Sequence, residues 1–195
     1  MNYPLTLTFK LITIGTRLSV RDAGGNLVAF VKPKRFKLKE DINVFADENQ
    51  TQLLYNVKAD SIIDFSARYN FTDAGGRFLG SIKRQGMRSL WKTNYQISDA
   101  GDRQILEIHE ENPWVKVIDS LVGEIPVLGM FSGYMFNPAY IVSREDKAPV
   151  VRLQKQPAFF ESKFEVSARA QFIQSEEPLI LLGIITMTLL ERGRG

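Results

Sequence analysis

Four turn motifs recur at an almost constant spacing along this sequence, and they constrain the fold more than any other feature. They begin at Asp22, Asp47, Asp73 and Asp99, so that successive motifs start 25 or 26 residues apart. Aspartate and asparagine side chains satisfy backbone groups in turns, and the glycines that follow three of these aspartates accept positive φ. A constant period indicates a repeated supersecondary unit. Each unit is predicted here to be a β-hairpin.

The residues between the turns alternate between apolar and polar, which is typical of half-buried strands. The alternation is clear at residues 5–11, 17–21, 65–72 and 164–169, and a less regular fifth hairpin tip is expected at residues 143–147. Five or six hairpins correspond to roughly ten to twelve strands, and a sheet of that size usually closes or splits. An open sheet would also leave edge strands that invite aggregation.

An apolar segment near the C-terminus, residues 178–190, is predicted to form a buried helix. Its apolar side chains cover all faces, which requires burial in protein or in lipid. Ser175 is a plausible N-cap, Glu176 and Glu177 suit the positive end of the helix dipole, and Pro178 fits the first turn. The segment would span about 20 Å as a helix, whereas a membrane span needs about 20 residues. We therefore expect a central helix over about residues 176–191 and no transmembrane span, with a second, short helix at residues 112–122.

The length and composition are those of an ordinary globular protein, with 195 residues of which 44% are hydrophobic, and we expect a single domain over residues 1–195. The absence of cysteine excludes disulfides, zinc-thiolate sites and cysteine nucleophiles, and it favours a reducing compartment. A net charge of +3 is well below the excess typical of a nucleic-acid-binding protein. Residues 1–14 lack the basic and apolar regions of a signal peptide. These features predict a cytoplasmic protein that could associate peripherally with a membrane.

Three segments resemble the tubby C-terminal-like superfamily, within which the sequence is most similar to LURP-one-related proteins and phospholipid scramblases. They are residues 73–84, residues 95–102 and residues 164–190. The resemblance implies a mainly β fold, a closed antiparallel barrel of about twelve strands around a buried C-terminal helix. Scramblases carry an acidic calcium-binding segment just before that helix. Here residues 168–177 contain only two adjacent carboxylates and an arginine, so we do not expect a calcium site.

Candidate catalytic side chains are few. His109 is the single histidine and is expected on the solvent side of a strand, opposite Leu106 and Ile108. Glu107, Glu110 and the adjacent Glu111 could act as paired carboxylates, but such a run is more often a solvated loop. No nucleophile, base and orienting group are grouped together. We therefore expect a protein that is not an enzyme, with no catalytic residues, no metal and no cofactor.

Two clusters of basic residues are the candidate binding site. They consist of Lys32, Lys34, Arg35, Lys37 and Lys39, and of Lys83, Arg84, Arg88 and Lys92. The clusters follow the first and third turn motifs, so that equivalent places in a barrel could bring both to one rim. A basic rim with interleaved aromatic residues suits an anionic phospholipid headgroup, and tubby domains bind phosphoinositides. The alternative is that these residues are solvated strand faces on which lysine protects the edges.

Three other functions remain open from the sequence. A structural or protein-interaction domain could use the apolar segment 128–136 if that segment were exposed, although a core strand there is the more usual outcome. Scramblase-like lipid transport would require the C-terminal helix to leave the barrel, which its length disfavours. Enzyme activity would need a pocket that joins two buried carboxylates, which the sequence does not indicate.

Overall fold

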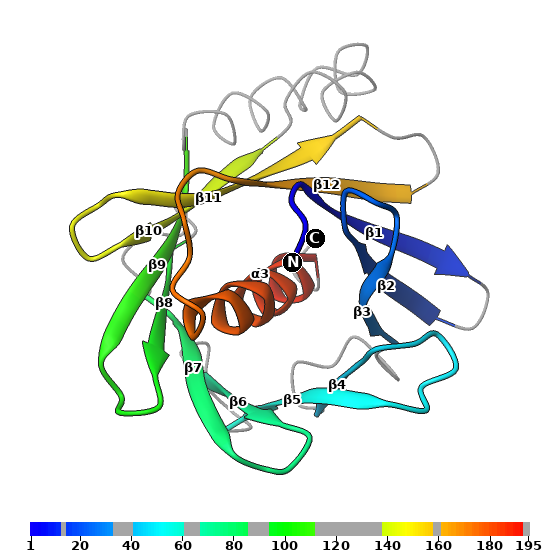
Figure 1. Ribbon diagram of the computed structural model, residues 1–195, viewed down its shortest axis with the longest axis horizontal. Coiled ribbons are helices and arrows are strands. Elements are labelled where there is room, and N and C mark those ends of the chain that lie inside the picture. Colours follow the sequence, from blue (N-terminus) through cyan, green and yellow to red (C-terminus); the bar gives the residue numbers. More distant parts are fainter. Residues whose placement is uncertain are drawn as a thin grey trace, which may run out of the picture.

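Twelve strands form one closed antiparallel barrel around a C-terminal helix (Figure 1), which confirms the predicted fold class. The computed structural model describes residues 1–12, 15–32, 41–60, 67–85, 94–111, 138–157 and 161–192. Each strand pairs with its neighbours in the chain, and β1 pairs with β12 to close the barrel. The elements are β1 (Leu5–Ile12), β2 (Gly15–Arg21), β3 (Leu27–Val31), β4 (Ile42–Phe45), β5 (Leu53–Ala59), β6 (Arg68–Asp73), β7 (Phe78–Arg84), β8 (Asn94–Asp99), β9 (Gln104–Glu110), β10 (Ala139–Arg144), β11 (Pro149–Gln156), β12 (Glu161–Ala168) and α3 (Glu176–Arg192).

The repeated turn motifs are the tips of hairpins, as the sequence predicts. The Oδ1 atoms of Asp22, Asp73 and Asp99 each accept a hydrogen bond from the backbone N–H four residues later, over 2.9, 2.9 and 3.0 Å. Asp47 binds the N–H of Thr51 in the same way. The fifth tip lies between β10 and β11, and all five hairpins have a register shift just before the turn. The same local geometry therefore recurs with the sequence period.

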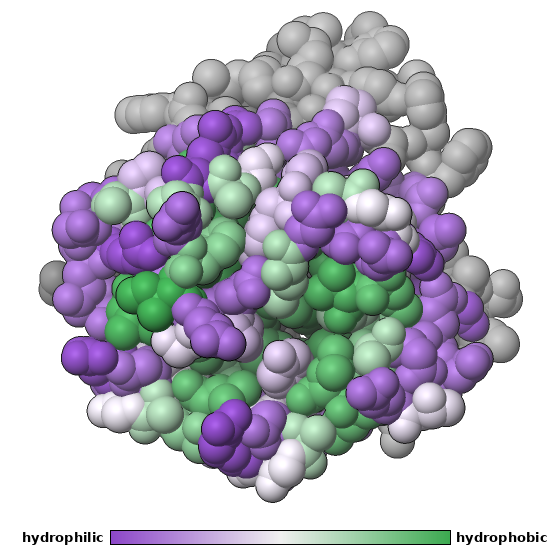
Figure 2. Space-filling model, viewed as in Figure 1, coloured by the Kyte–Doolittle hydropathy of each residue, from purple (hydrophilic) through white to green (hydrophobic). Residues whose placement is uncertain are grey.

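This topology gives the barrel two distinct ends. The five turns and the start of α3 share one end, which we name the hairpin end. Strands β3 and β7 both run away from it, and α3 ends at the opposite end. In Figure 1 the five hairpins surround α3. Figure 2, in the same view, shows hydrophobic side chains at the mouth of the barrel inside a rim of hydrophilic ones.

Helix α3 lies inside the barrel and is buried on all its faces from Leu179 to Leu189, because no side of it is polar enough to face water. It contacts β6, β7 and β8. A Cβ added at Gly183 would lie 2.5 Å from Ile97 Cδ1, so the absence of a side chain lets the helix approach β8 closely. No helix among the described residues is long and apolar enough to cross a membrane.

The start of α3 is held by Glu176, one residue after the predicted N-cap Ser175. The Glu176 carboxylate accepts a hydrogen bond from the backbone N–H of Ile173 at 3.0 Å and forms an ion pair with Arg144 at 2.8 Å. The arginine hydrogen bond is the main reason why the pKa of Glu176 is lowered. The predicted helix at residues 112–122 and the apolar segment 128–136 lie outside the described residues.

Candidate functional site

Lys32 and Lys83 of the predicted basic clusters lie at the same end of the barrel. Lys32 directly follows β3 and Lys83 is the penultimate residue of β7, so both are at the end opposite the hairpin tips. Both side chains are exposed, and neither forms an ion pair with another described residue. Lys34, Arg35, Lys37, Lys39, Arg88 and Lys92 lie outside the described residues.

Strand register places two further cations beside Lys32. Lys10 of β1 is directly opposite Arg17 of β2. Leu18 is opposite Val31, so the next pair in this register is Arg17 and Lys32. We name Lys10, Arg17 and Lys32 the basic row. Like charges opposite one another destabilise a sheet. On its other side Lys10 is directly opposite Glu161 of β12, whose carboxylate lies 3.9 Å away with both side chains exposed, so this pair stabilises little. The row therefore has three cations and one carboxylate at its end.

Lys10 and Arg17 were not among the residues that the sequence singled out. Their position on the outer face could have been found, because both alternate with apolar residues in predicted strands. Their proximity to Lys32 could not, because it depends on the register of β1, β2 and β3. In the sequence, neither Lys10 nor Arg17 belongs to a cluster of basic residues.

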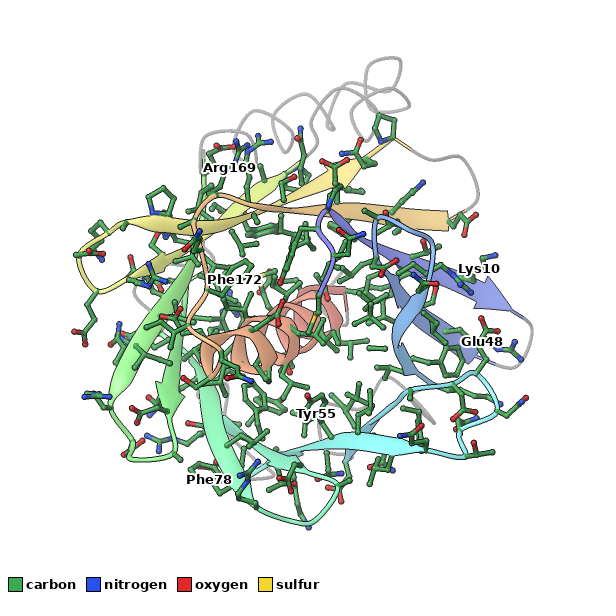
Figure 3. All side chains as sticks on the ribbon, in the orientation of Figure 1. Lys10, Glu48, Tyr55, Phe78, Arg169 and Phe172 are labelled. Carbon is green, nitrogen blue, oxygen red and sulfur yellow. The ribbon has the colours of Figure 1, made fainter. Side chains whose placement is uncertain are left out.

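A shallow hollow on the outer wall adjoins the basic row. It has a volume of about 300 Å³, and its lining contains three cations, two carboxylates, two hydroxyl residues and one aromatic residue: Lys10, Arg17, Arg21, Glu48, Glu161, Thr8, Ser19 and Phe30. Thr8 and Ser19 are directly opposite each other in the ladder. The Arg21 guanidinium is bound to Glu48 at 3.0 Å and Lys10 lies 3.9 Å from Glu161, so Arg17 is the lining cation that has no ion pair with another described residue. Figure 3 shows Lys10 and Glu48 on the same side of the barrel, away from α3. Such a surface can hold an anionic oxygen-rich group.

Arg84, although next to Lys83 in the sequence, is directed into the barrel. Its guanidinium lies 3.9 Å from the carboxylate of Glu191 and 6.0 Å from the ring centre of Tyr95. The Tyr95 hydroxyl donates a hydrogen bond of 2.7 Å to Glu191, and burial raises the pKa of Tyr95 well above its ordinary value. Arg84 thus contacts the end of α3, because alternate residues of β7 face opposite sides of the wall.

Of the three glutamates near His109, only Glu111 lies in the exposed position that the sequence favoured, just after β9, where it forms an ion pair with Arg152 at 2.7 Å. Glu107 and Glu110 belong to β9, and Glu110 is buried because it shares the inward face with Leu106 and Ile108. Glu107 is bound by Lys147 at 2.6 Å. His109 lies on the outer face as expected, with its side chain 37% exposed and Nδ1 3.7 Å from Glu107.

The closed barrel with a buried C-terminal helix defines the class of protein to which this chain is similar. The family model described as LURP-one-related matches residues 27–178, and the chain belongs to that family. A solved X-ray structure of a protein from Arabidopsis thaliana, AT5G01750, superimposes with a TM-score of 0.50 at 14% sequence identity. The match covers 97% of this chain and 91% of the plant protein, and it shows the shared fold. No curated protein matches the sequence.

Proposed function

We propose that this LURP-one-related protein is a non-enzymatic binding domain that docks on an anionic phospholipid surface through the basic row and Lys83. The observation that carries this proposal is the arrangement of Lys10, Arg17 and Lys32 in one cross-strand row. Repulsion within such a row is relieved when an anionic surface covers it. Docking of this kind would place the protein at the cytoplasmic face of a membrane, where anionic lipids are enriched.

The charge distribution of the barrel supports an orientation for this docking. The turn aspartates Asp22, Asp47, Asp73 and Asp99 all lie at the hairpin end, far from the basic row. Two of these aspartates, Asp73 and Asp99, are paired with Arg77 and Arg103. Attraction between the basic row and an anionic membrane would therefore be the main force that orients the barrel. Each lysine or arginine near such a surface contributes about 1 kcal/mol. Four cations would give weak binding that falls steeply with salt.

The environment of His109 supports a function without catalysis. Its neighbouring carboxylate, Glu107, is bound by Lys147, and a general base would need an orienting partner and a nucleophile within hydrogen-bond reach. The chemistry proposed for this protein is therefore electrostatic attraction between surface cations and lipid phosphate.

Co-sedimentation with liposomes tests the proposal. The protein would be mixed with vesicles of neutral phosphatidylcholine, or of phosphatidylcholine with phosphatidylserine, across a salt series. We expect binding only to the anionic vesicles and only at low salt. This binding should be lost in the variant in which Lys10, Arg17, Lys32 and Lys83 are all changed to Ala.

A matched variant removes four cations from the hairpin end, namely Arg77, Arg103, Lys147 and Arg169, each changed to Ala. Its net charge equals that of the first variant, so retained binding would locate the docking surface at the basic row. Equal loss of binding in both variants would show that binding depends on net charge and not on the basic row. Absence of binding by the unaltered protein at low salt would refute lipid docking. Thermal unfolding of each variant checks that the barrel is intact.

A further inference from the structure

A carboxylate extends the basic row on the outer wall of the barrel. Strand register puts Glu161, Lys10 and Arg17 side by side on β12, β1 and β2, and Lys32 follows them at the end of β3. Neighbouring strands lie about 4.8 Å apart, so these groups form a line in which one anion is followed by three cations. All four side chains are exposed. The wall therefore carries a pattern of charge that a ligand could match group by group.

The charged groups of this line differ in how far they are already neutralised. Lys10 Nζ lies 3.9 Å from the carboxylate of Glu161, which is too long for a direct hydrogen bond. Both groups can therefore bind a further charged partner. Arg17 and Lys32 form no ion pair with another described residue. An external anion can bind the Arg17 guanidinium without breaking an existing contact, and it can do so through two parallel hydrogen bonds.

The hollow beside the line adds hydroxyl groups and a second carboxylate. Thr8 and Ser19 are opposite each other, and each lies two residues from a cation of the line, on the same face of its strand. The Arg21 guanidinium is held by Glu48 at 3.0 Å. The lining as a whole contains three cations and two carboxylates, an excess of one positive charge. The hollow thus suits a ligand of mixed charge whose net charge is negative and small.

Lys163, a further cation nearby, does not change this pattern. It is exposed on the outer face of β12, directly opposite Thr8, and it lies outside the lining of the hollow. Glu161 and Glu165 lie two residues before and after it on the same face of the strand. Its charge is therefore offset by two neighbouring carboxylates.

We propose that the hollow and the line recognise a phospholipid headgroup with an ammonium and a carboxylate beside its phosphate, the chemistry of phosphatidylserine. The phosphate would bind the Arg17 guanidinium and accept hydrogen bonds from the hydroxyls of Thr8 and Ser19. The serine carboxylate would pair with Lys10 and the serine ammonium with Glu161, which lie on adjacent strands. This inference rests on the proposed lipid docking and names the class of lipid.

The two carboxylates of the hollow disfavour other headgroups. A glycerol headgroup has the same net charge as a serine headgroup but offers no ammonium to Glu161. A headgroup with phosphomonoesters carries more negative charge, which Glu48 and Glu161 would repel. An ethanolamine headgroup has an ammonium but no net negative charge to draw it to the basic row. Among these headgroups, the one with serine matches both the signs and the excess of charge on the wall.

Co-sedimentation at one low salt concentration tests this inference with phosphatidylcholine vesicles that contain an equal fraction of phosphatidylserine or of phosphatidylglycerol. Electrostatic docking alone predicts equal binding, because the surface charge is the same. Headgroup recognition predicts binding about threefold to fivefold tighter to phosphatidylserine, the gain expected from one exposed ion pair. Equal binding would overturn headgroup recognition and leave lipid docking intact, whereas absence of binding to both vesicles would refute both. Tighter binding to phosphatidylinositol 4-phosphate at the same total charge would also overturn it.

Two single variants with the same change in charge locate the site. Glu161→Gln should bind phosphatidylglycerol vesicles more tightly, since it removes a carboxylate, and yet lose the preference for phosphatidylserine, since the ammonium loses its partner. Glu165→Gln, on the same face of β12 but outside the hollow, is the control and should keep the preference. A preference that survives Glu161→Gln, or that both variants lose equally, would contradict the assigned site. Both side chains are exposed, and thermal unfolding checks that each barrel is intact.

Discussion

Replacing Gly80 by alanine should destabilise this barrel more than the same change at Gly76 or at Gly183. Gly80 follows the irregularity in β7 and has φ +153°, a conformation that residues with a Cβ rarely adopt. An added Cβ would lie 2.2 Å from the backbone carbonyl oxygen of Ser98 and 3.0 Å from Leu179 Cδ2. The first atom belongs to the neighbouring strand and the second to the buried helix. Neither can move without disturbing the β7–β8 ladder or the packing of α3.

The expected loss combines two effects. A strained backbone conformation costs about 1–3 kcal/mol, and overpacking a well-packed site costs about 1–3 kcal/mol, so that the variant should lose about 2–6 kcal/mol. That is a large part of a total stability of about 5–15 kcal/mol for a domain of this kind. The free energy of unfolding, measured by urea denaturation with circular dichroism, is the appropriate observable.

Two matched variants separate the causes. Gly76 has φ +82° with no atom within 4 Å of an added Cβ, so Gly76→Ala should show only the conformational cost of about 1–2 kcal/mol. Gly183→Ala meets the flexible end of Ile97 and gains about 1 kcal/mol of helix propensity, so its net change should be small. If Gly80→Ala proves no more destabilising than Gly76→Ala, the clash with β8 does not exist and the reasoning is refuted.

Three further predictions concern Glu176, Tyr95 and the buried tyrosines. Glu176→Gln should make the free energy of unfolding less sensitive to acid. The ion pair with Arg144 keeps the pKa of Glu176 in the folded protein below its ordinary value of 4.5. The stabilisation that this ion pair gives is therefore present above pH 4.5 and is lost as pH falls through the lower folded pKa. Urea denaturation at pH 3 to 7 would measure the difference between the two proteins. Tyr95→Phe should lose about 1.5–3 kcal/mol, because it deletes a hydrogen bond to a carboxylate, and a loss below 0.5 kcal/mol in urea denaturation would contradict this. Burial raises the pKa of Tyr3, Tyr95 and Tyr140, so tyrosinate absorbance should lag behind that of the unfolded chain above pH 10 and stability should fall there, since the unfolded state then binds fewer protons.

The hairpins and the central helix could be predicted from the sequence because local interactions form them. Asp73 and Asp99 bind N–H groups only four residues away, and inward residues such as Leu5 and Leu7 alternate with polar ones whatever the rest of the chain does. The apolar faces of α3 likewise require burial wherever the helix lies. These features predict many hairpins, one buried helix and basic clusters near one rim, whereas the closed barrel of about twelve strands was implied by the resemblance to the tubby C-terminal-like superfamily.

Only the tertiary structure decided which surfaces these elements build. Pairing of β1 with β12 joins segments from the two ends of the chain, and the register of β1 to β3 aligns Lys10, Arg17 and Lys32. The same long-range packing directs Arg84 inward to Glu191. It also brings the β6–β7 and β8–β9 turns beside the start of α3, where the three segments line one cavity. Sequence periodicity specifies which face of a strand a side chain occupies. Its neighbours on that face depend on the register between strands, which the closure of the barrel and the packing of the buried helix determine together.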